Sequence, residues 1–383
     1  MTDHMPEDLS AIGRDLRAYT DELRPWHGVV RNVQGDWVLL SHDLVLQAAR
    51  DDQRFSSAVS RHLHIPNGLD GAEHSAYRAA LDRFLTPGAL APFRGAFHRA
   101  AVDVVALLPR GVAVDAVGGF GSRFAVRAQS AWLGWPSDLE DRLVDWVAEN
   151  HAATRLGDRS RTRQVAEAFD ALIRDVLARR RDVAPPDAAY DVTARLMRTE
   201  VDGWPLTDEE IVSVLRNWTG GDLGTIALCV GVLVHRLATQ PAMQDRLRAG
   251  VSDVEFDAIV DEILRIDDPF VSNRCVTTCP VTIGGVELPQ GARVKLNWTS
   301  ANRDESVFGN PDAMDPQRNA TYNLVYGIGR HACPGRPLAT LELRIAMQAL
   351  LAATSSITLA PQSPAEREVA PVGGWARVPV MLA

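Results

Sequence analysis

The feature that most constrains this chain is one uninterrupted helical pattern of about thirty residues, from Thr207 to a stop at Pro241. Thr207 and Glu210 form a capping box, in which each side chain satisfies a free backbone N–H at the helix start. The apolar residues then recur at helical spacing: Ile211, Val214, Leu215, Trp218, Ile226, Val230 and Leu233. At 1.5 Å per residue the helix is ~45 Å long, so we predict a central strut that crosses a whole domain.

Helical periodicity dominates the rest of the chain, and the predicted strands are short. The other predicted helices are Asp43–Arg50, Ala76–Phe84, Phe97–Leu108, Ser137–Asn150, Arg161–Arg181, Asp187–Glu200, Phe256–Ile266 and Leu338–Ala353. The predicted strands are Val29–Val33 and Trp37–Leu40 as a hairpin, then Val281–Ile283, Val286–Leu288, Arg293–Leu296 and a final pair near Trp375–Leu382. The predicted class is therefore mainly α with small antiparallel β-sheets.

Composition excludes several classes of protein. The chain has 383 residues, of which 46% are hydrophobic, so it can bury a sizeable core. A net charge of −9 argues against nucleic acid as a partner. The segment from Met1 to Arg17 lacks the pattern of a signal peptide, and we find no apolar run of the ~18–20 residues that a membrane span needs. We expect a soluble, cytoplasmic protein without a membrane partner, whose residues 1–20 are a flexible segment.

One cysteine stands apart from the other three. Cys229, Cys275 and Cys279 have no metal-ligand spacing, and we expect ordinary thiols there. Cys333 lies in a glycine-rich loop, directly before a predicted helix. A lone thiolate held in this way can be the axial ligand of a haem iron. The residues alone leave open a second interpretation, a glycine-rich turn with a buried cysteine.

The loop has a fixed order of residue types: Tyr326, Gly327, Gly329, His331, Cys333 and Gly335. This order resembles the cysteine signature of the cytochrome P450 family, an aromatic residue followed by Gly-x-Gly-x-His-x-Cys-x-Gly. Tyr326 stands where phenylalanine is usual in that family. The resemblance implies haem b as the cofactor, Cys333 as the iron ligand, and contacts to the cofactor from Tyr326, Gly327 and Gly335. It also implies one triangular-prism domain over residues 1–383, built around the long helix.

Further residues match the family elsewhere in the chain. Glu262 and Arg265 lie three apart on one helix face, where the resemblance implies a buried structural ion pair. Haem carries two propionates, which need cations or hydrogen-bond donors. The residues at the family's propionate-contacting positions are His74, Arg78, Arg274 and His331. The segment 301–311 also resembles the family's sequence before the cysteine loop.

The long helix departs from the family pattern. The family carries a small residue and glycine, then any residue, an acid and a threonine, and the last two relay protons. Aligned on Gly220-Gly221, this chain has Leu223 in the acid's place and Gly224 in the threonine's, with Asp222 and Thr225 each displaced by one residue. Three interpretations stay open: a local bulge restores Asp222 and Thr225, water and substrate carry the protons, or the enzyme uses peroxide or performs another reaction.

The resemblance implies a haem-thiolate monooxygenase that inserts one oxygen atom from O2 into a small organic substrate, a secondary metabolite or a xenobiotic. The resemblance implies a pocket lined by Gly220, Gly221, Phe270, Val271 and Ser272. The chain has no flavin or iron–sulfur motif, so electrons must come from a ferredoxin or flavodoxin with its reductase. Exposed arginines near the loop could dock such a partner: Arg330, Arg336 and Arg83.

Two other functions remain from the residues: a peroxide-using or non-oxygenating haem enzyme, and a haem-dependent binding or sensor protein. No sensor or output domain is visible in the sequence, which disfavours the sensor. His62 and His64 are expected at the surface, with a pocket role as the alternative.

Overall fold

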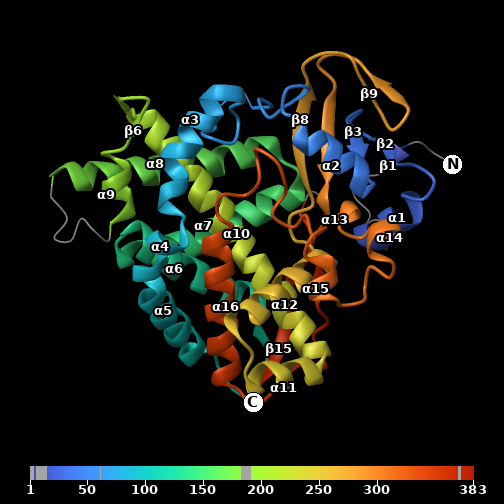
Figure 1. The fold of residues 1–383 in the computed structure, drawn as a ribbon. Helices are drawn as coiled ribbons and strands as arrows, with labels where there is room; N and C mark the ends of the chain where they lie inside the picture. Colours follow the sequence, from blue (N-terminus) through green and yellow to red (C-terminus); the bar gives the residue numbers. More distant parts are fainter. Residues whose placement is uncertain (1–3, 6–14, 61, 183–190, 370–371) are drawn as a thin grey trace.

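A computed structural model of the chain describes residues 4–5, 15–60, 62–182, 191–369 and 372–383. The predicted strut is helix α10 (Asp208–Thr239), which has 32 residues and runs through the middle of the molecule (Figure 1). Its capping box is confirmed, because Thr207 N donates to Glu210 Oε2 at 2.6 Å and Glu210 N donates to Thr207 Oγ1 at 3.4 Å. α10 is long and apolar enough to cross a membrane, but 72% of its most apolar window is buried inside the protein, which makes it a core helix.

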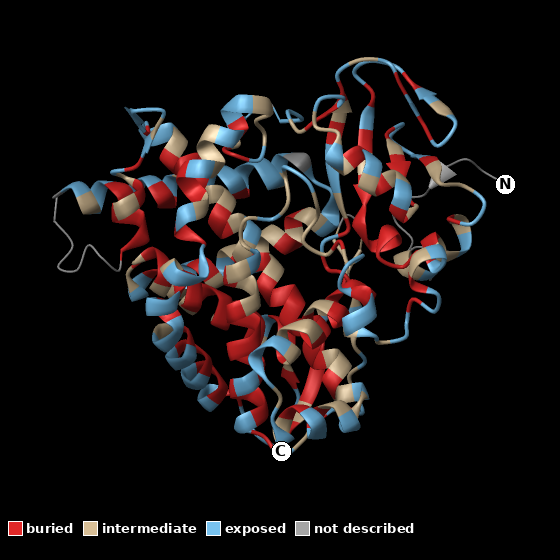
Figure 2. Cartoon of the chain, in the orientation of Figure 1, coloured by how far each residue is buried: buried red, intermediate tan, exposed pale blue. Residues whose placement is uncertain are grey.

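The other helices surround α10 in a triangular outline, and buried residues concentrate on the helices at its centre (Figure 2). They are α1 (Leu16–Leu23), α2 (His42–Arg50), α3 (Gly71–Leu81), α4 (Pro87–Leu90), α5 (Arg94–Leu107), α6 (Arg123–Leu133), α7 (Glu140–Leu156), α8 (Arg159–Asp182), α9 (Val192–Leu196), α11 (Pro241–Ala249), α12 (Asp253–Ile266), α13 (Trp298–Ala301), α14 (Glu305–Phe308), α15 (Pro316–Asn319) and α16 (Arg336–Ala352). A π-helical segment, η4 (Ala116–Ser122), precedes α6.

Close backbone packing holds α10 against η4. A Cβ on Gly121 would lie 2.8 Å from the carbonyl oxygen of Ala227, and a Cβ on Gly231 would lie 2.5 Å from Val117 Cγ2. Neither glycine tolerates a side chain without displacing its neighbour. The two residues therefore set how near the central helix lies to η4.

Within the described residues, the strands form one larger sheet and four small ones. The larger sheet has the order β1-β2-β3-β11-β8-β4, with β1 parallel to β2 and β3 parallel to β11. Its strands are β1 (His4–Met5), β2 (Val29–Asn32), β3 (Trp37–Leu39), β4 (Phe55–Ser56), β8 (Ser272–Thr277) and β11 (Arg293–Asn297). The small sheets contain β5 (Val114–Asp115), β6 (Glu200–Val201), β7 (Trp204–Pro205), β9 (Val281–Ile283), β10 (Val286–Leu288), β12 (Ile357–Leu359), β13 (Glu366–Arg367), β14 (Trp375–Arg377) and β15 (Pro379–Leu382).

Several predicted elements are confirmed, and two need correction. The hairpin of β2 and β3 is present, with Val30 opposite Val38. The two final strands do not pair with each other, because β14 pairs with β13, and β15 lies between β12 and β5. The helix predicted at Asp187–Glu200 is wrong over its described part, where only Val192–Leu196 is helical and Glu200 begins a strand; residues 187–190 lie outside the described residues. α6 and η4 were not predicted.

The N-terminal segment is described only in part. Residues 1–3 and 6–14 of the segment expected to be flexible lie outside the described residues. Within the rest, Asp15 caps α1 by accepting a hydrogen bond from Arg17 N at 2.9 Å. Leu16–Thr20 are helical, and the flexibility of the segment stays a prediction.

A buried ion pair ties α12 to the segment that leads to Cys333. Arg265 Nε donates to Glu262 Oε2 at 2.8 Å, and both side chains are almost completely buried. The guanidinium also donates to the backbone carbonyls of Asn302 at 2.7 Å and Pro311 at 3.0 Å. The Glu262 carboxylate accepts hydrogen bonds from Asp315 N at 3.1 Å and from the side-chain amide of Asn319 at 2.7 Å. The predicted structural pair of Glu262 and Arg265 is thus present.

Removing one partner of this pair should be strongly destabilising. Glu262→Ala leaves the buried Arg265 guanidinium without its counter-charge, so we expect a loss of about 3–5 kcal/mol in the free energy of unfolding, measured by urea denaturation. Asp175→Ala is the matched control, because Asp175 pairs with Arg179 at 2.9 Å at the surface of α8, and such pairs contribute about 0–1 kcal/mol. Equal losses in the two variants would contradict the structural role of the buried pair.

Candidate active site

The cysteine loop folds back on itself before α16 begins. Cys333 N donates to the carbonyl oxygen of Tyr326 at 2.8 Å, which closes the loop. Cys333 keeps an accessible surface, although burial raises the pKa of its thiol. Backbone N–H groups of Gly335 and Arg336, at the start of α16, donate to the sulfur and act in the opposite direction on that pKa. The N-terminal dipole of a helix adds to this stabilisation of a thiolate.

Two loop glycines have different reasons for being glycine. Gly329 has a φ of 80°, and a Cβ there would lie 2.5 Å from the carbonyl oxygen of Ala49, so no other residue fits. Gly335 has a φ of −77°, an ordinary right-handed value, and its Cβ position is 3.7 Å from Cys333 Sγ. The loop therefore needs left-handed backbone before the cysteine but not at Gly335.

The hydroxyl that distinguishes Tyr326 from phenylalanine lies inside the protein. It lies near Asp261 and Thr340, and burial raises the pKa of the phenol. Arg336 covers the ring at 5.2 Å and donates to Asp261 Oδ2 at 2.9 Å. The additional hydroxyl thus has polar neighbours, and the substitution leaves the loop intact.

The structure brings together three of the four predicted propionate contacts. The rings of His74 and His331 lie 4.2 Å apart, and the Arg78 guanidinium donates to the carbonyl oxygen of Ala332 at 3.1 Å. His74 is 1% exposed, and neither of its ring nitrogens has a hydrogen-bond partner among the described residues. Burial, together with repulsion from His331 and Arg78, lowers the pKa of His74 to about 4. Arg274 is not in this group: it lies on β8 opposite Lys295, and its charge acts on His64.

Helix α10 presents different residues to different sides. It is α-helical from Asp208 to Thr239, so the proposed local bulge is absent. Gly221 and Thr225, one turn apart, keep accessible surface, and a Cβ on Gly221 would have no atom within 4 Å. Gly220 has the same open surroundings, whereas Gly224 is buried. The accessible alcohol on this side of α10 is therefore that of Thr225.

Asp222 faces a second carboxyl group, that of Glu342 on α16. Burial raises the pKa of Asp222 to about 7, and burial together with the Asp222 charge raises the pKa of Glu342. Among the described residues, no other donor reaches Asp222 Oδ2 or either carboxyl oxygen of Glu342. Two carboxyl groups in contact share one proton between them. Sequence reasoning missed Glu342; a charged residue within the apolar pattern of the last helix was the available signal.

His151 is a second residue that sequence reasoning missed. It lies on α7, is 9% exposed, and makes no hydrogen bond with another described residue. A Cβ on Gly224 would lie 2.8 Å from its Nε2. Burial lowers the pKa of this histidine, while Glu368 raises it and Arg155 lowers it. No motif marks His151, because the pair it makes with Gly224 joins residues on two separate helices.

The segment Leu63–Ile65, which contains His64, is bound directly to α10. Ser213 Oγ accepts from Ile65 N at 2.8 Å and donates to the carbonyl oxygen of Leu63 at 3.0 Å. His64 is half-buried, and burial lowers its pKa, with Arg216 and Arg274 acting in the same direction. His62 is exposed, as expected.

The predicted pocket residues after α12 differ in exposure. Phe270 is 45% exposed, and Val271 is 5% exposed. Ser272 begins β8 and is half-buried. Phe270 is therefore the one whose side chain is open to a ligand.

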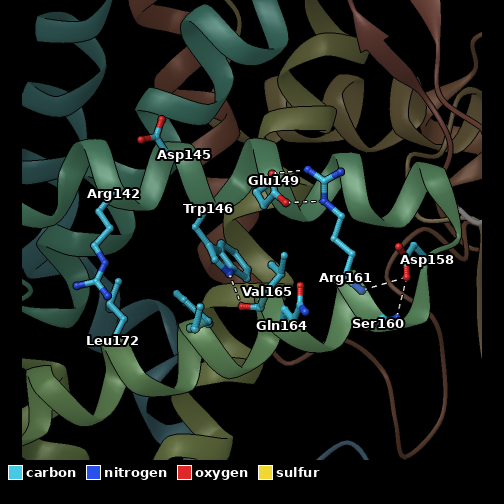
Figure 3. A pocket seen from close by; sticks show the side chains of 12 residues that line it. Arg142, Asp145, Trp146, Glu149, Asp158, Ser160, Arg161, Gln164, Val165 and Leu172 are labelled. Carbon is cyan, nitrogen blue, oxygen red and sulfur yellow. Dashed lines mark hydrogen bonds and ion pairs between the residues drawn. The ribbon is translucent and has the colours of Figure 1, made fainter.

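A groove of about 720 Å³ lies between α7 and α8 (Figure 3). Trp146 stacks on Phe169 at 4.0 Å and donates to the carbonyl oxygen of Val165 at 3.1 Å, while Arg161 pairs with Glu149 at 2.6 Å. None of the predicted site residues lines it. At 3.6 residues per turn, His151 points to nearly the opposite side of α7 from Trp146, so the groove and the contact of His151 with Gly224 lie on different sides of α7.

Comparison with known proteins assigns the class. The sequence profile named Cytochrome P450 matches residues 154–366. The chain is 31% identical over 355 residues to the cyclomarin C epoxidase CymV of Salinispora arenicola, with 88% of each chain covered. It is 28% identical over 360 residues to the erythromycin C-12 hydroxylase of Saccharopolyspora erythraea, again with 88% of each covered.

A solved structure agrees. The open cytochrome P450 EryK from S. erythraea superposes with a TM-score of 0.86 at 26% identity, covering 96% of this chain and 95% of that one. The chain belongs to the cytochrome P450 family. It is an oxidoreductase of the oxygenase kind, with a haem cofactor and a need for an external supply of electrons.

The residues around Cys333 fit that cofactor. A buried imidazole with both nitrogens unpartnered, beside Arg78 and His331, suits an anionic group such as a propionate. The accessible sulfur at the start of α16 suits a metal ligand. The glycines of α10 leave room for a flat group, since no atom lies within 4 Å of a Cβ on Gly220 or Gly221.

The shared proton of Asp222 and Glu342 should make stability depend on pH. The pKa of Asp222 is about 7 in the folded protein, against about 3.9 when unfolded. At this pair the folded state thus binds more protons between these values, so the contribution of the pair to stability is greatest below the lower value and falls as pH rises to about 7. Glu342→Gln should flatten this dependence and stabilise the protein at pH 8 by on the order of 2 kcal/mol, measured by urea unfolding at pH 6 and pH 8.

Asp141→Asn is the control, since the Asp141 side chain is 91% exposed. It should leave the pH dependence of the parent unchanged. An unaltered slope in Glu342→Gln as well would show that the two carboxyl groups do not share a proton.

Proposed function

We propose that the chain is a soluble, cytoplasmic haem-thiolate monooxygenase in which Cys333 ligates the iron of haem b. The observation that carries the proposal is the placement of an accessible Cys333 sulfur under the N–H groups of Gly335 and Arg336. The unpartnered His74 nearby supports it, together with His331 and Arg78, as the propionate-binding group. The resemblance also assigns a propionate contact to Arg274, which lies apart from these three residues on β8.

The haem supplies the chemistry of oxygen activation, and the chain's residues position and protect it. The N–H groups at the start of α16 stabilise the Cys333 thiolate. Tyr326 and Gly327 shape the loop beneath the cofactor. On the other side, Gly220 and Gly221 keep α10 free of side chains, and the hydroxyl of Thr225 holds a proton at the accessible face.

This arrangement assigns a different register to α10 from the one based on Gly220-Gly221. Gly221 and Thr225 form the accessible pair, so we place Thr225 where the family has its threonine and Gly224 where it has its acid. Asp222 then belongs to the carboxyl pair with Glu342. In this register Asp222 is removed from the direct proton route, and Gly224 marks where a side chain is missing.

The cysteine assignment has a direct spectroscopic test. Cys333→Ala should abolish the thiolate-type Soret band of the reduced carbon monoxide complex, because no other described cysteine lies at the start of a helix. Cys275→Ala is the control, since Cys275 is buried on β8 with its thiol facing the carbonyl oxygen of Val294 at 3.6 Å. A thiolate-type band that survives in Cys333→Ala would refute the assignment.

We propose a secondary metabolite as the substrate class and a ferredoxin or flavodoxin with its reductase as the electron source. Relatives named as an epoxidase of cyclomarin C and a hydroxylase of erythromycin support the substrate class. Arg83, Arg330 and Arg336 are exposed, and Arg330 and Arg336 lie in the cysteine loop and at the start of α16, which supports the docking of an acidic partner. A spectral-shift screen of such metabolites against the ferric protein tests the substrate class.

A second candidate function is peroxide-driven oxidation, which the absence of an acid at Gly224 favours. For the monooxygenase we expect product formation with NADPH, a ferredoxin and its reductase under air, and none with hydrogen peroxide alone. The measurement is product yield with a compound from the screen, with heat-denatured protein as the control. Turnover by peroxide and none by the electron-transfer proteins would select the second function.

A further inference from the structure

The side chain missing from α10 at Gly224 is replaced by one from another helix. A Cβ on Gly224 would lie 2.8 Å from Nε2 of His151, so the imidazole occupies the space where a side chain from α10 would begin. Gly224 is buried, and a glycine within a helix costs about 1 kcal/mol relative to alanine. The helix loses stability at this position, and what it gains is contact with the ring.

The ring is polar and keeps a little accessible surface. His151 is 9% exposed and makes no hydrogen bond with any residue in the described part of the chain. Its ring nitrogens are not among the fully buried atoms that lack a partner, whereas those of His74 are. A nitrogen that stays accessible beside Gly224 can exchange a proton, which an apolar residue in the same space could not do.

The charged groups near His151 are an ion pair that extends from the interior to the surface. On α7 the neighbour one turn on is Arg155, and from the segment after β13 it is Glu368. These two residues bind each other, with Arg155 Nε 2.9 Å from Glu368 Oε2 and Nη2 2.8 Å from Oε1. The Glu368 side chain is 1% exposed and that of Arg155 is 36% exposed, so the pair leads from the interior to solvent. α10 itself contributes Gly224, which has no charge.

We propose that His151 supplies, from α7, the distal polar group that α10 lacks at Gly224, and holds a proton-exchanging nitrogen beside the Gly224–Thr225 turn. Burial keeps the imidazole neutral near pH 7. A neutral imidazole passes one proton at a time: a proton that arrives at one ring nitrogen leaves from the other, and the ring ends neutral. Acting through the Thr225 hydroxyl, His151 is a positioning residue. The proposal rests on the proposed function, which gives this turn its role.

The contact is tested first by stability, without any turnover. Gly224→Ala should lower the midpoint of thermal unfolding because the new Cβ collides with the ring. In the background of His151→Ala the collision is gone, so the same substitution should raise the midpoint, because alanine is more favourable than glycine within a helix by about 1 kcal/mol. Gly88→Ala is the control, because a Cβ there has no atom within 4 Å. Equal effects of Gly224→Ala in the two backgrounds would overturn the contact, and with it the proposal.

The role is tested with the haem-loaded protein, NADPH, ferredoxin and reductase under air, without added substrate. His151→Phe should lower oxygen consumption by about 10²-fold, the lower end of what acid–base groups contribute, and should raise the share of oxygen released as hydrogen peroxide. His151→Gln, which keeps a polar group, should recover part of the loss, and so should His151→Ala combined with Gly224→Asp. His235→Phe is the matched control, a half-buried histidine that stacks on Trp375 at 3.9 Å.

The reduced carbon monoxide spectrum of each variant separates the two levels of failure. A parent protein without a thiolate-type band refutes the proposed function and the role of His151 together. A normal band in all variants, with unchanged oxygen consumption and peroxide release in His151→Phe, refutes only the role of His151. Normal bands with the expected losses and recoveries support it. Ring-nitrogen shifts of His151 in ¹⁵N spectra should also move in Gly224→Ala, and unmoved shifts would count against the contact.

Discussion

The structure depends on one buried ion pair more than on any single residue of the site. Arg265 uses its guanidinium to bind Glu262 and backbone carbonyls between Asn302 and Pro311. Asn302 in turn accepts a hydrogen bond from Leu324 N at 2.7 Å, two residues before Tyr326. A long segment, in which α14 and α15 are short helices of four residues each, is thereby fixed against α12. Because this segment leads to Cys333 and cannot move independently of α12, the ion pair also fixes the position of Cys333.

Local sequence signals predicted the elements whose causes are local. The capping box at Thr207 and the apolar period of α10 act within one helix, and both are present as expected. The π-helical segment η4 was not predictable in this way, because its glycines do not indicate a helix by themselves. Their reason is a tertiary contact, the close packing of Gly121 on Ala227 of α10. The helix predicted at Asp187–Glu200 was wrong for a related reason. Its helical period is overridden at Glu200, which pairs in a strand with Pro205.

The site divides along the same line. A motif of ten residues predicted Cys333 and its loop, because ligand and supporting backbone are contiguous in sequence. The carboxyl pair of Asp222 with Glu342 and the contact of His151 with Gly224 join residues far apart in the chain. Their chemistry depends on burial and on which helices pack against each other, and the local spacing of residues predicts neither. The register of α10 was uncertain from sequence because this part of the helix fits two alignments to the family pattern. Only exposure separates Gly221 and Thr225 from Gly224.

The hydrogen bonds between α10 and the segment Leu63–Ile65 have a mechanical consequence. Ser213 holds this segment through both its donor and its acceptor, and Arg216 and Asn217 add further bonds to it. The segment therefore cannot swing open as an independent flap. A bulky ligand can therefore enter only if these hydrogen bonds break or if the first turns of α10 move together with the segment. In the second case the movement would reach Thr225, two turns further along α10.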